Sequence, residues 1–215
     1  MQDDAPVRRR QMRSPSVDAI AETPFYIAAT GPSARPRRIL KHDDTFAVFD
    51  SHGDMGASAG GPDGLFDHDT RFLSRLELLV SGTQPLLLGS SVSDDNVALS
   101  VDLTNADIFR DGQIVLPRDT VHIVRSTYLW QGAARQRIAV ANHGMSAVSF
   151  EIAFMFGNDF ADIFEVRGQR RQKRGRLQEE MRGAGGVALV YHGLDGKARC
   201  SDLSFDPAPT SRTVS

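Results

Sequence analysis

The feature that most constrains the fold is a spacing of two between large apolar residues. In the clearest run, Val148, Phe150, Ile152, Phe154 and Phe156 alternate with smaller or polar residues. A helix would mix these side chains with Ser and Glu on one face, whereas a strand places all five on one side of a sheet. The sequence therefore predicts a strand over residues 148–156, with Phe150, Ile152 and Phe154 almost fully buried.

The same alternation occurs in residues 97–103 and 121–130, and shorter apolar runs follow turn sequences such as Asp111-Gly112. Those shorter runs predict strands at residues 25–28, 38–41, 45–49, 75–80, 86–88, 113–116, 135–141, 187–191 and 198–205. About a dozen short strands with turns between them are typical of a β-sandwich or barrel. The predicted fold class is all-β, an antiparallel β-sandwich with little helix, and the one expected helix is short, at residues 67–73.

Composition along the chain predicts three regions. Residues 1–23 are rich in arginine and carry no periodic apolar pattern, so we expect a disordered basic tail. Residues 24–206 form the predicted β-sandwich domain, and residues 207–215 a C-terminal tail. The Arg-rich run at residues 167–182 is interpreted as a solvated hairpin or a mobile loop, with a phosphate or nucleic-acid contact as the alternative.

Charge and cysteine content exclude several classes of protein. Lys plus Arg number 25 against 27 for Asp plus Glu, a balance unlike that of dedicated nucleic-acid binders. No apolar run approaches the ~20 residues of a membrane span, and the first residues lack the apolar stretch of a secretory signal. The only cysteine, Cys200, excludes an intramolecular disulfide and a cysteine zinc site. The sequence predicts a cytoplasmic protein without a membrane or nucleic-acid partner.

The first polar cluster lies in residues 64–74 and contains Asp67, His68, Asp69 and Arg71. We interpret it as a sharp chain reversal in which Asp69 pairs with Arg71 and His68 donates to a backbone carbonyl. A polar patch that contacts a sugar or a neighbouring domain is the functional alternative.

The second polar cluster lies in residues 158–168 and follows the most strongly patterned strand. Asp159, Asp162 and Glu165 recur every three residues and precede Arg167. Such carboxylates can cap turns or accept hydrogen bonds from sugar hydroxyls. Two carboxylates are also what glycoside hydrolysis requires, although three spaced acids are not a specific signature of it.

Other chemistry has weaker support in the residues. A metal site is a third interpretation of the first cluster, because His52 and Asp54 lie near it in the chain, but no regular ligand spacing is present. There is no Gly-x-Ser-x-Gly nucleophile motif, and the glycines of residues 53–61 lack the strand-to-helix setting of a phosphate or dinucleotide loop. We therefore expect no cofactor, no metal and no catalytic residue.

The two clusters, in this order, resemble the N-terminal domain of bacterial glycogen-debranching enzymes of the amylo-α-1,6-glucosidase type. The matching stretches are Gly-Leu-Phe-Asp-His-Asp-Thr-Arg-Phe-Leu-Ser at 64–74, Asn-His-Gly at 142–144 and Asp-Phe-Ala-Asp-Ile-Phe-Glu-Val-Arg-Gly at 159–168. Residues 46–54 are also similar, so the resemblance covers about residues 24–205.

The resemblance implies a β-supersandwich that precedes an all-helical (α/α)6 catalytic domain. Family members cleave α-glucosidic branch linkages in glycogen-like polymers, and their catalytic carboxylates belong to the helical barrel. The chain is then expected to be a non-catalytic domain or fragment, inactive by itself, that packs against a barrel supplied in cis or by an adjacent reading frame. It would shape one side of the substrate cleft, with an α-glucan or oligosaccharide as a further partner.

The alternative to this expectation is a free-standing carbohydrate-binding or protein-interaction module without an enzyme partner. In either case, the candidate contact residues are those of the two clusters. They are Asp67, His68, Asp69, Arg71, Asp159, Asp162, Glu165 and Arg167. We expect the clusters to lie on one side of the sandwich and to leave an apolar patch exposed beside Phe66, Phe72, Phe160 and Phe164.

Overall fold

The computed structural model describes residues 36–56 and 61–211, all within one compact unit. Within these ranges the chain forms fifteen strands and one helix of four residues, and every strand pairing is antiparallel. The predicted class, an all-β antiparallel sandwich with little helix, is confirmed.

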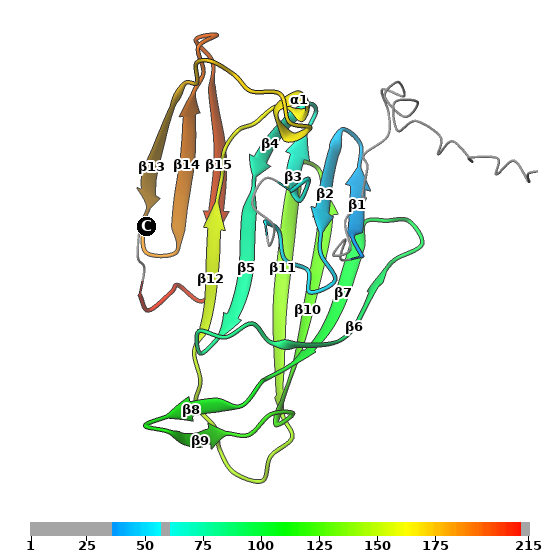
Figure 1. The fold of residues 1–215 in the computed structure, drawn as a ribbon, viewed down its shortest axis with the longest axis vertical. Helices are drawn as coiled ribbons and strands as arrows, with labels where there is room; N and C mark the ends of the chain where they lie inside the picture. The colour runs from blue at the N-terminus through cyan, green and yellow to red at the C-terminus, as the bar shows by residue number, and fades with distance from the viewer. Residues whose placement is uncertain (1–35, 57–60, 212–215) are drawn as a thin grey trace, which may run out of the picture. The chain divides into compact units, whose positions relative to one another are not determined.

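One layer of the sandwich consists of two neighbouring sheets (Figure 1). The first has the order β1-β2-β3-β4, and the second pairs β12 with β5. The bounds are β1 Arg38–His42, β2 Thr45–Phe49, β3 Gly64–Asp67, β4 Thr70–Leu73, β5 Arg75–Val80 and β12 Ile152–Gly157.

The opposite layer is a four-stranded sheet of order β11-β10-β7-β6. Its strands are β6 Leu86–Val92, β7 Ala98–Thr104, β10 Val121–Trp130 and β11 Ala133–Asn142. Strand β10 pairs over its whole length with β11, because both strands have ten residues and a two-residue turn joins them.

The remaining elements extend these layers. A hairpin of β8 Ile108–Arg110 and β9 Gln113–Leu116 turns at Asp111-Gly112, where both residues have positive φ, as the hairpin prediction requires. After the helix α1 (Ile163–Val166), a three-stranded sheet contains β13 Arg176–Arg182, β14 Gly186–His192 and β15 Ala198–Ser204. Strand β15 lies against β4.

The core fills the space between the two layers. Strand β1 contacts β6, β7 and β10 of the opposite sheet, and inward side chains of both layers form one buried cluster. Its fully buried members include Leu40, Phe49, Met55, Leu78, Leu99, Val101, Leu103, Val121, Ile123 and Leu129. The inward positions of β7 and β10 are those that the period of two predicted.

The prediction that Phe150, Ile152 and Phe154 are almost fully buried is wrong. Phe150 and Phe154 are half-buried, and Ile152 is 37% exposed. The reason is the position of β12, which pairs only with β5 among the described strands and so lies at the margin of its layer. Its Phe154 ring packs on Phe205, with the two ring centroids 6.1 Å apart.

The predicted helix at residues 67–73 is also wrong, because these residues form the turn between β3 and β4 and then β4 itself. The real helix begins after Asp162, in the second polar cluster. The Arg-rich run ends in β13, the exposed strand of a hairpin with β14, as its interpretation as a solvated hairpin expected. The predicted tail of residues 1–23 and the strand at 25–28 lie outside the described residues.

Candidate functional site

The structure brings the two polar clusters together, although 88 residues separate their central pair. The Arg71 amide donates to the Ala161 carbonyl at 2.8 Å, and the Ile163 amide donates to the Asp69 carbonyl at 2.9 Å. The second cluster therefore runs beside β4 like a short additional strand. The expectation that both clusters lie on one side of the sandwich agrees with this arrangement (Figure 1).

Arg71 is the centre of this contact. Its Nε and Nη2 donate to the two carboxylate oxygens of Asp159 at 3.1 and 2.5 Å, a bidentate geometry that is among the strongest hydrogen-bonding arrangements. Its Nη1 donates to the carbonyls of Gly61 and Asp63 at 2.8 and 3.1 Å. The side chain is 8% exposed, so this cation is held inside the protein by a carboxylate and two carbonyls.

Two neighbours in β3 make room for the Arg71 side chain. Its guanidinium carbon lies 5.9 Å from the ring centroid of Phe66, within the range of a cation–π contact. Gly64 has a φ of +150°, and a Cβ there would lie 2.5 Å from the Arg71 Cδ and 2.6 Å from the Leu73 carbonyl oxygen. Only glycine fits at this position, which explains why the motif begins with it.

Asp162 and Glu165 form a reciprocal cap at the start of α1. The Asp162 carboxylate accepts from the amides of Phe164 and Glu165 at 2.9 and 2.8 Å, and the Glu165 carboxylate accepts from the Asp162 amide at 3.1 Å. Burial by itself would raise the pKa of Asp162, but hydrogen bonds from these amides and from Arg171 lower it overall. In the structure these acids therefore cap backbone amides, which is the commoner of their two expected uses.

Two arginines of the Arg-rich run complete this network, and the sequence analysis did not assign them to it. Arg171 pairs with Asp162 and approaches Glu165 at 3.2 Å, while Arg174 binds Glu165 at 2.8 Å. The three consecutive acids at intervals of three were a signal for such partners, because they lie directly before the basic run. Arg167 ends α1 with an exposed side chain.

The turn between β3 and β4 differs from its prediction. His68 has a φ of +50°, and its Nδ1 lies 3.0 Å from the Asp67 carboxylate rather than at a backbone carbonyl. Hydrogen bonding to Asp67, together with the charges of Asp67, Asp44 and Asp69, raises the pKa of His68. The predicted Asp69–Arg71 pair is wrong, since Asp69 is exposed in the turn while Arg71 points inward to Asp159.

The apolar patch expected at the clusters is also largely missing. Phe66 and Phe160 are buried, and Phe72 is half-buried against Phe160, with ring centroids 5.5 Å apart. Phe160 also stacks on Tyr191 at 5.4 Å. Only Phe164, on α1, is more than half exposed among these four rings. Phe72 and Tyr191 anchor Phe160 of the second cluster to the sandwich, and Phe66 stacks on Phe46 of β2, so these rings form no open surface.

The chemistry of the clusters favours structure and contact over catalysis. A general acid in glycoside hydrolysis needs a raised pKa, whereas the pKa of Asp162 is lowered and both oxygens of Glu165 bind arginines. Asp159 is held by both of its oxygens on Arg71. These three carboxylates therefore serve as hydrogen-bond acceptors for cations and amides.

A second polar centre, not recognised in the sequence, lies inside the sandwich. Arg125 is fully buried on β10, and its Nη1 donates to Asp54 at 2.5 Å and to the His52 carbonyl at 3.1 Å. Asp54 also accepts from the Leu78 amide at 3.0 Å and from Gln84 at 3.1 Å. Burial lowers the pKa of Arg125, whereas the charge of Asp54 opposes that shift.

The signal for this centre was visible in the alternation of β10, where an arginine occupies an inward position after two apolar ones. The residues that could have formed a metal site therefore lie in two separate places. His52 and Asp54 are near Arg125. Asp67, His68 and Asp69 are at the β3–β4 turn. Residues 36–56 and 61–211 contain no group of three or more His, Cys, Asp or Glu that could hold a metal ion.

The Arg71–Asp159 pair is expected to contribute measurably to stability. In a double-mutant cycle of Arg71→Ala and Asp159→Ala, urea unfolding should give a coupling of about 1–3 kcal/mol, because the bidentate pair of a buried arginine is broken. The matched control is Arg75–Glu77, also bidentate but with the arginine side chain 43% exposed. That control pair should couple by at most about 1 kcal/mol. Equal coupling in the two cycles would contradict this assignment.

Comparison with known proteins identifies one family. A family model described as the N-terminal domain of some glycogen debranching enzymes matches residues 40–215. No curated protein and no solved structure matches the chain. The single helix within the described ranges has four residues, far short of a membrane span.

Proposed function

The chain belongs to the family of N-terminal domains of some glycogen debranching enzymes, and from this premise we propose that it is a non-catalytic domain that packs against the enzyme's catalytic domain and shapes one side of its substrate cleft. The family resemblance noted in the sequence supports a helical catalytic partner, in cis or from an adjacent reading frame. The proposal includes a cytoplasmic location.

The observation that carries this proposal is the β8–β9 hairpin. Phe109, Ile114 and Val115 are 62%, 50% and 48% exposed, and Phe109 pairs directly with Ile114 across the two strands. The hairpin lies beyond the ends of β7 and β10 (Figure 1). Adjacent exposed apolar side chains on a projecting element are typical of a protein–protein contact.

The base of the same hairpin is anchored firmly. Leu116 is buried, and the Asn105 side chain, fully buried, donates to the carbonyls of Ala106 and Pro117 at 2.8 and 2.7 Å. Its carbonyl oxygen accepts from the amides of Thr120 and Val121. A hairpin with a rigid base and exposed apolar side chains on its strands can dock on a second domain at little entropic cost.

The polar clusters have a supporting part in this proposal. Arg71, Asp159, Asp162 and Glu165 hold the segment before β13 against β4, so that the exposed groups there keep fixed positions. Those exposed groups, His68, Asp69 and Arg167 among the candidate contact residues, lie at the end of the sandwich opposite the hairpin (Figure 1), where they supply charges for a separate contact.

Co-expression tests the docking directly. We expect the chain to elute together with the all-helical domain encoded beside it, and Phe109→Asp and Ile114→Asp to weaken that association at least about tenfold, because each places a charge in an apolar contact. The control is Leu177→Asp on β13, a side chain of similar exposure, 49%, on another sheet. Unchanged association of both hairpin variants would refute the contact.

The purified chain is also expected to release no glucose from glycogen, since its clustered carboxylates are bound to cations and amides. Glucose release that disappears in Asp159→Asn or Asp162→Asn would overturn the non-catalytic assignment. When a catalytic domain is added, hydrolysis of glycogen should appear, and it should not depend on Asp159 or Asp162.

A further inference from the structure

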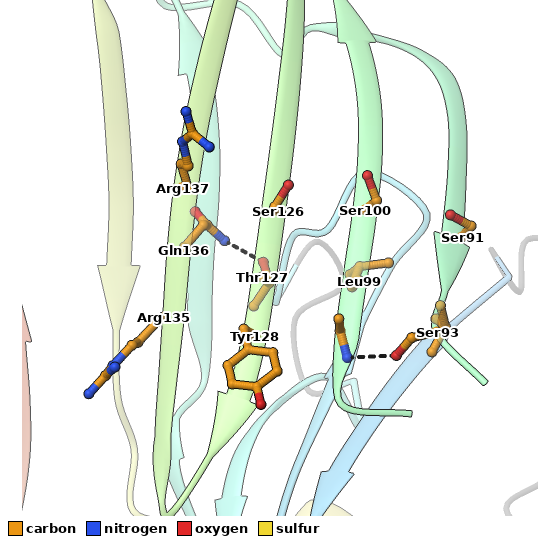
Figure 2. Close-up of a pocket in the computed structure, with 12 residues that line it drawn as sticks. Ser91, Ser93, Leu99, Ser100, Ser126, Thr127, Tyr128, Arg135, Gln136 and Arg137 are labelled. Carbon is orange, nitrogen blue, oxygen red and sulfur yellow. Dashed lines mark hydrogen bonds between the residues drawn. The ribbon is translucent and has the colours of Figure 1, made fainter. Parts of the chain in front are cut away.

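We propose that the outer face of the β11-β10-β7-β6 sheet is a binding site for a linear α-glucan chain. The choice of α-glucan as ligand rests on the proposed function, whereas the site itself rests on the geometry of the sheet. The site is a shallow groove of about 590 Å³ that crosses the four strands (Figure 2).

The groove has a floor of small hydroxyl side chains. The strand register places Ser91 opposite Ser100, Ser100 opposite Ser126, and Ser126 opposite Arg137, so that one row crosses the whole sheet. Serine side chains are short, and a row of them leaves the sheet surface hollow and accessible to a ligand. Figure 2 shows Ser91, Ser100 and Ser126 at the same level on adjacent strands.

Two exposed aromatic rings lie beside this row. Tyr128 and Trp130 are the next two outward residues of β10 and are 43% and 46% exposed. Their ring centroids are 6.2 Å apart and their planes differ by only 18°, so they present two nearly parallel faces. The His42 ring packs on the Trp130 ring, with their centroids 4.0 Å apart, and holds it in place.

Aromatic faces of this kind suit the C–H surface of a sugar ring, because each combines a large apolar area with a polar edge. Leaving both rings in water is unfavourable, and neither is needed to fill the core, which lies on the opposite face of the sheet. A polymer can enter such a groove from its open ends, which a closed pocket would not allow.

The polar groups of the groove match hydroxyls better than charges. Serine and tyrosine hydroxyls both donate and accept hydrogen bonds, as sugar hydroxyls do. Arg135 lies opposite Tyr128 and, with Arg137, supplies donors at one rim. The lining contains no carboxylate, and two arginines are few for a nucleic-acid backbone, whose binding depends on many phosphate contacts.

Trp130 is the only tryptophan of the chain, and its ring stacks on that of Tyr128, which lines the groove, so its fluorescence reports on this edge of the groove. Titration of the full chain with maltoheptaose should shift or quench the emission, and electrophoresis through glycogen-containing gels should retard the protein. We expect Tyr128→Ala and Arg137→Ala each to weaken binding on the order of tenfold or more. Leu177→Ala, a change of a half-exposed residue outside the groove, should bind as the unmodified chain does.

Three results would overturn the site. The first is that millimolar maltoheptaose leaves the emission unchanged and glycogen leaves the mobility unchanged. The second is that both groove variants bind as well as the unmodified chain and have unchanged melting temperatures. The third is that single-stranded DNA retards the protein more strongly than glycogen does.

If the helical domain covers the groove and no glucan binds there, the face is a domain contact. The hairpin variants separate the two proposals, because Phe109→Asp should weaken docking at least about tenfold and leave maltoheptaose binding intact.

Discussion

Replacement of Arg125 by alanine should destabilise the protein by about 3–5 kcal/mol, measured by urea unfolding. The Asp54 carboxylate, 1% exposed, would lose its only cation among the described residues and remain charged inside the sandwich. The change would also leave a cavity below β10, where Arg125 packs against the loop at Gly53.

The matched control for Arg125 is an arginine whose ion pair is exposed. Arg118 pairs with Asp119 at 3.1 Å, and 64% of the Arg118 side chain is exposed. Arg118→Ala should therefore change stability by no more than about 0.5 kcal/mol. If both alanine variants unfold at the same urea concentration, the buried pair does not have the role assigned to it.

Phe49 is fully buried between the layers, and its removal would leave a cavity in the main core. Phe49→Ala should therefore cost about 3–5 kcal/mol in urea unfolding. Phe154→Ala removes the same atoms from β12, where the ring is half-buried and already partly in contact with water. That substitution should cost only about 1–2 kcal/mol. The comparison isolates burial, as the two substitutions are chemically identical.

The order of these two phenylalanine effects is the decisive measurement. A larger loss at Phe154 than at Phe49 would mean that the margin of the β12–β5 sheet is covered in solution, by a second domain or a second copy of the chain. Adding the helical domain and repeating the Phe154→Ala measurement would then show whether that domain supplies the cover.

Much of the sandwich was predictable because strands, turns and hairpins depend on near neighbours in the chain. The alternation in β7 and β10 predicted which side chains face inward, and Asp111-Gly112 predicted a hairpin through the positive φ that these residues tolerate. The two polar clusters were recognisable as motifs for the same reason, since each is a continuous stretch of sequence.

The local sequence led to a wrong prediction where two kinds of secondary structure fit the same pattern of residues. The stretch at residues 67–73 fits a short helix as well as a turn and a strand, and pairing of β4 with β3 decides between them. The arginine on the inward face of β10 was visible, but its partner could not be identified, because a buried arginine can pair with any acid that the fold brings near it.

The sequence by itself determined the all-β class, the strand faces and the family, because these follow from local periodicity and continuous motifs. Only the tertiary structure decided that Arg71 binds Asp159 rather than Asp69, that Arg125 binds Asp54 across 71 residues, and that β12 lies at a margin. Ion-pair partners and burial depend on which strands pack face to face. That packing is set by the summed burial of both layers, so no single segment of the chain encodes it.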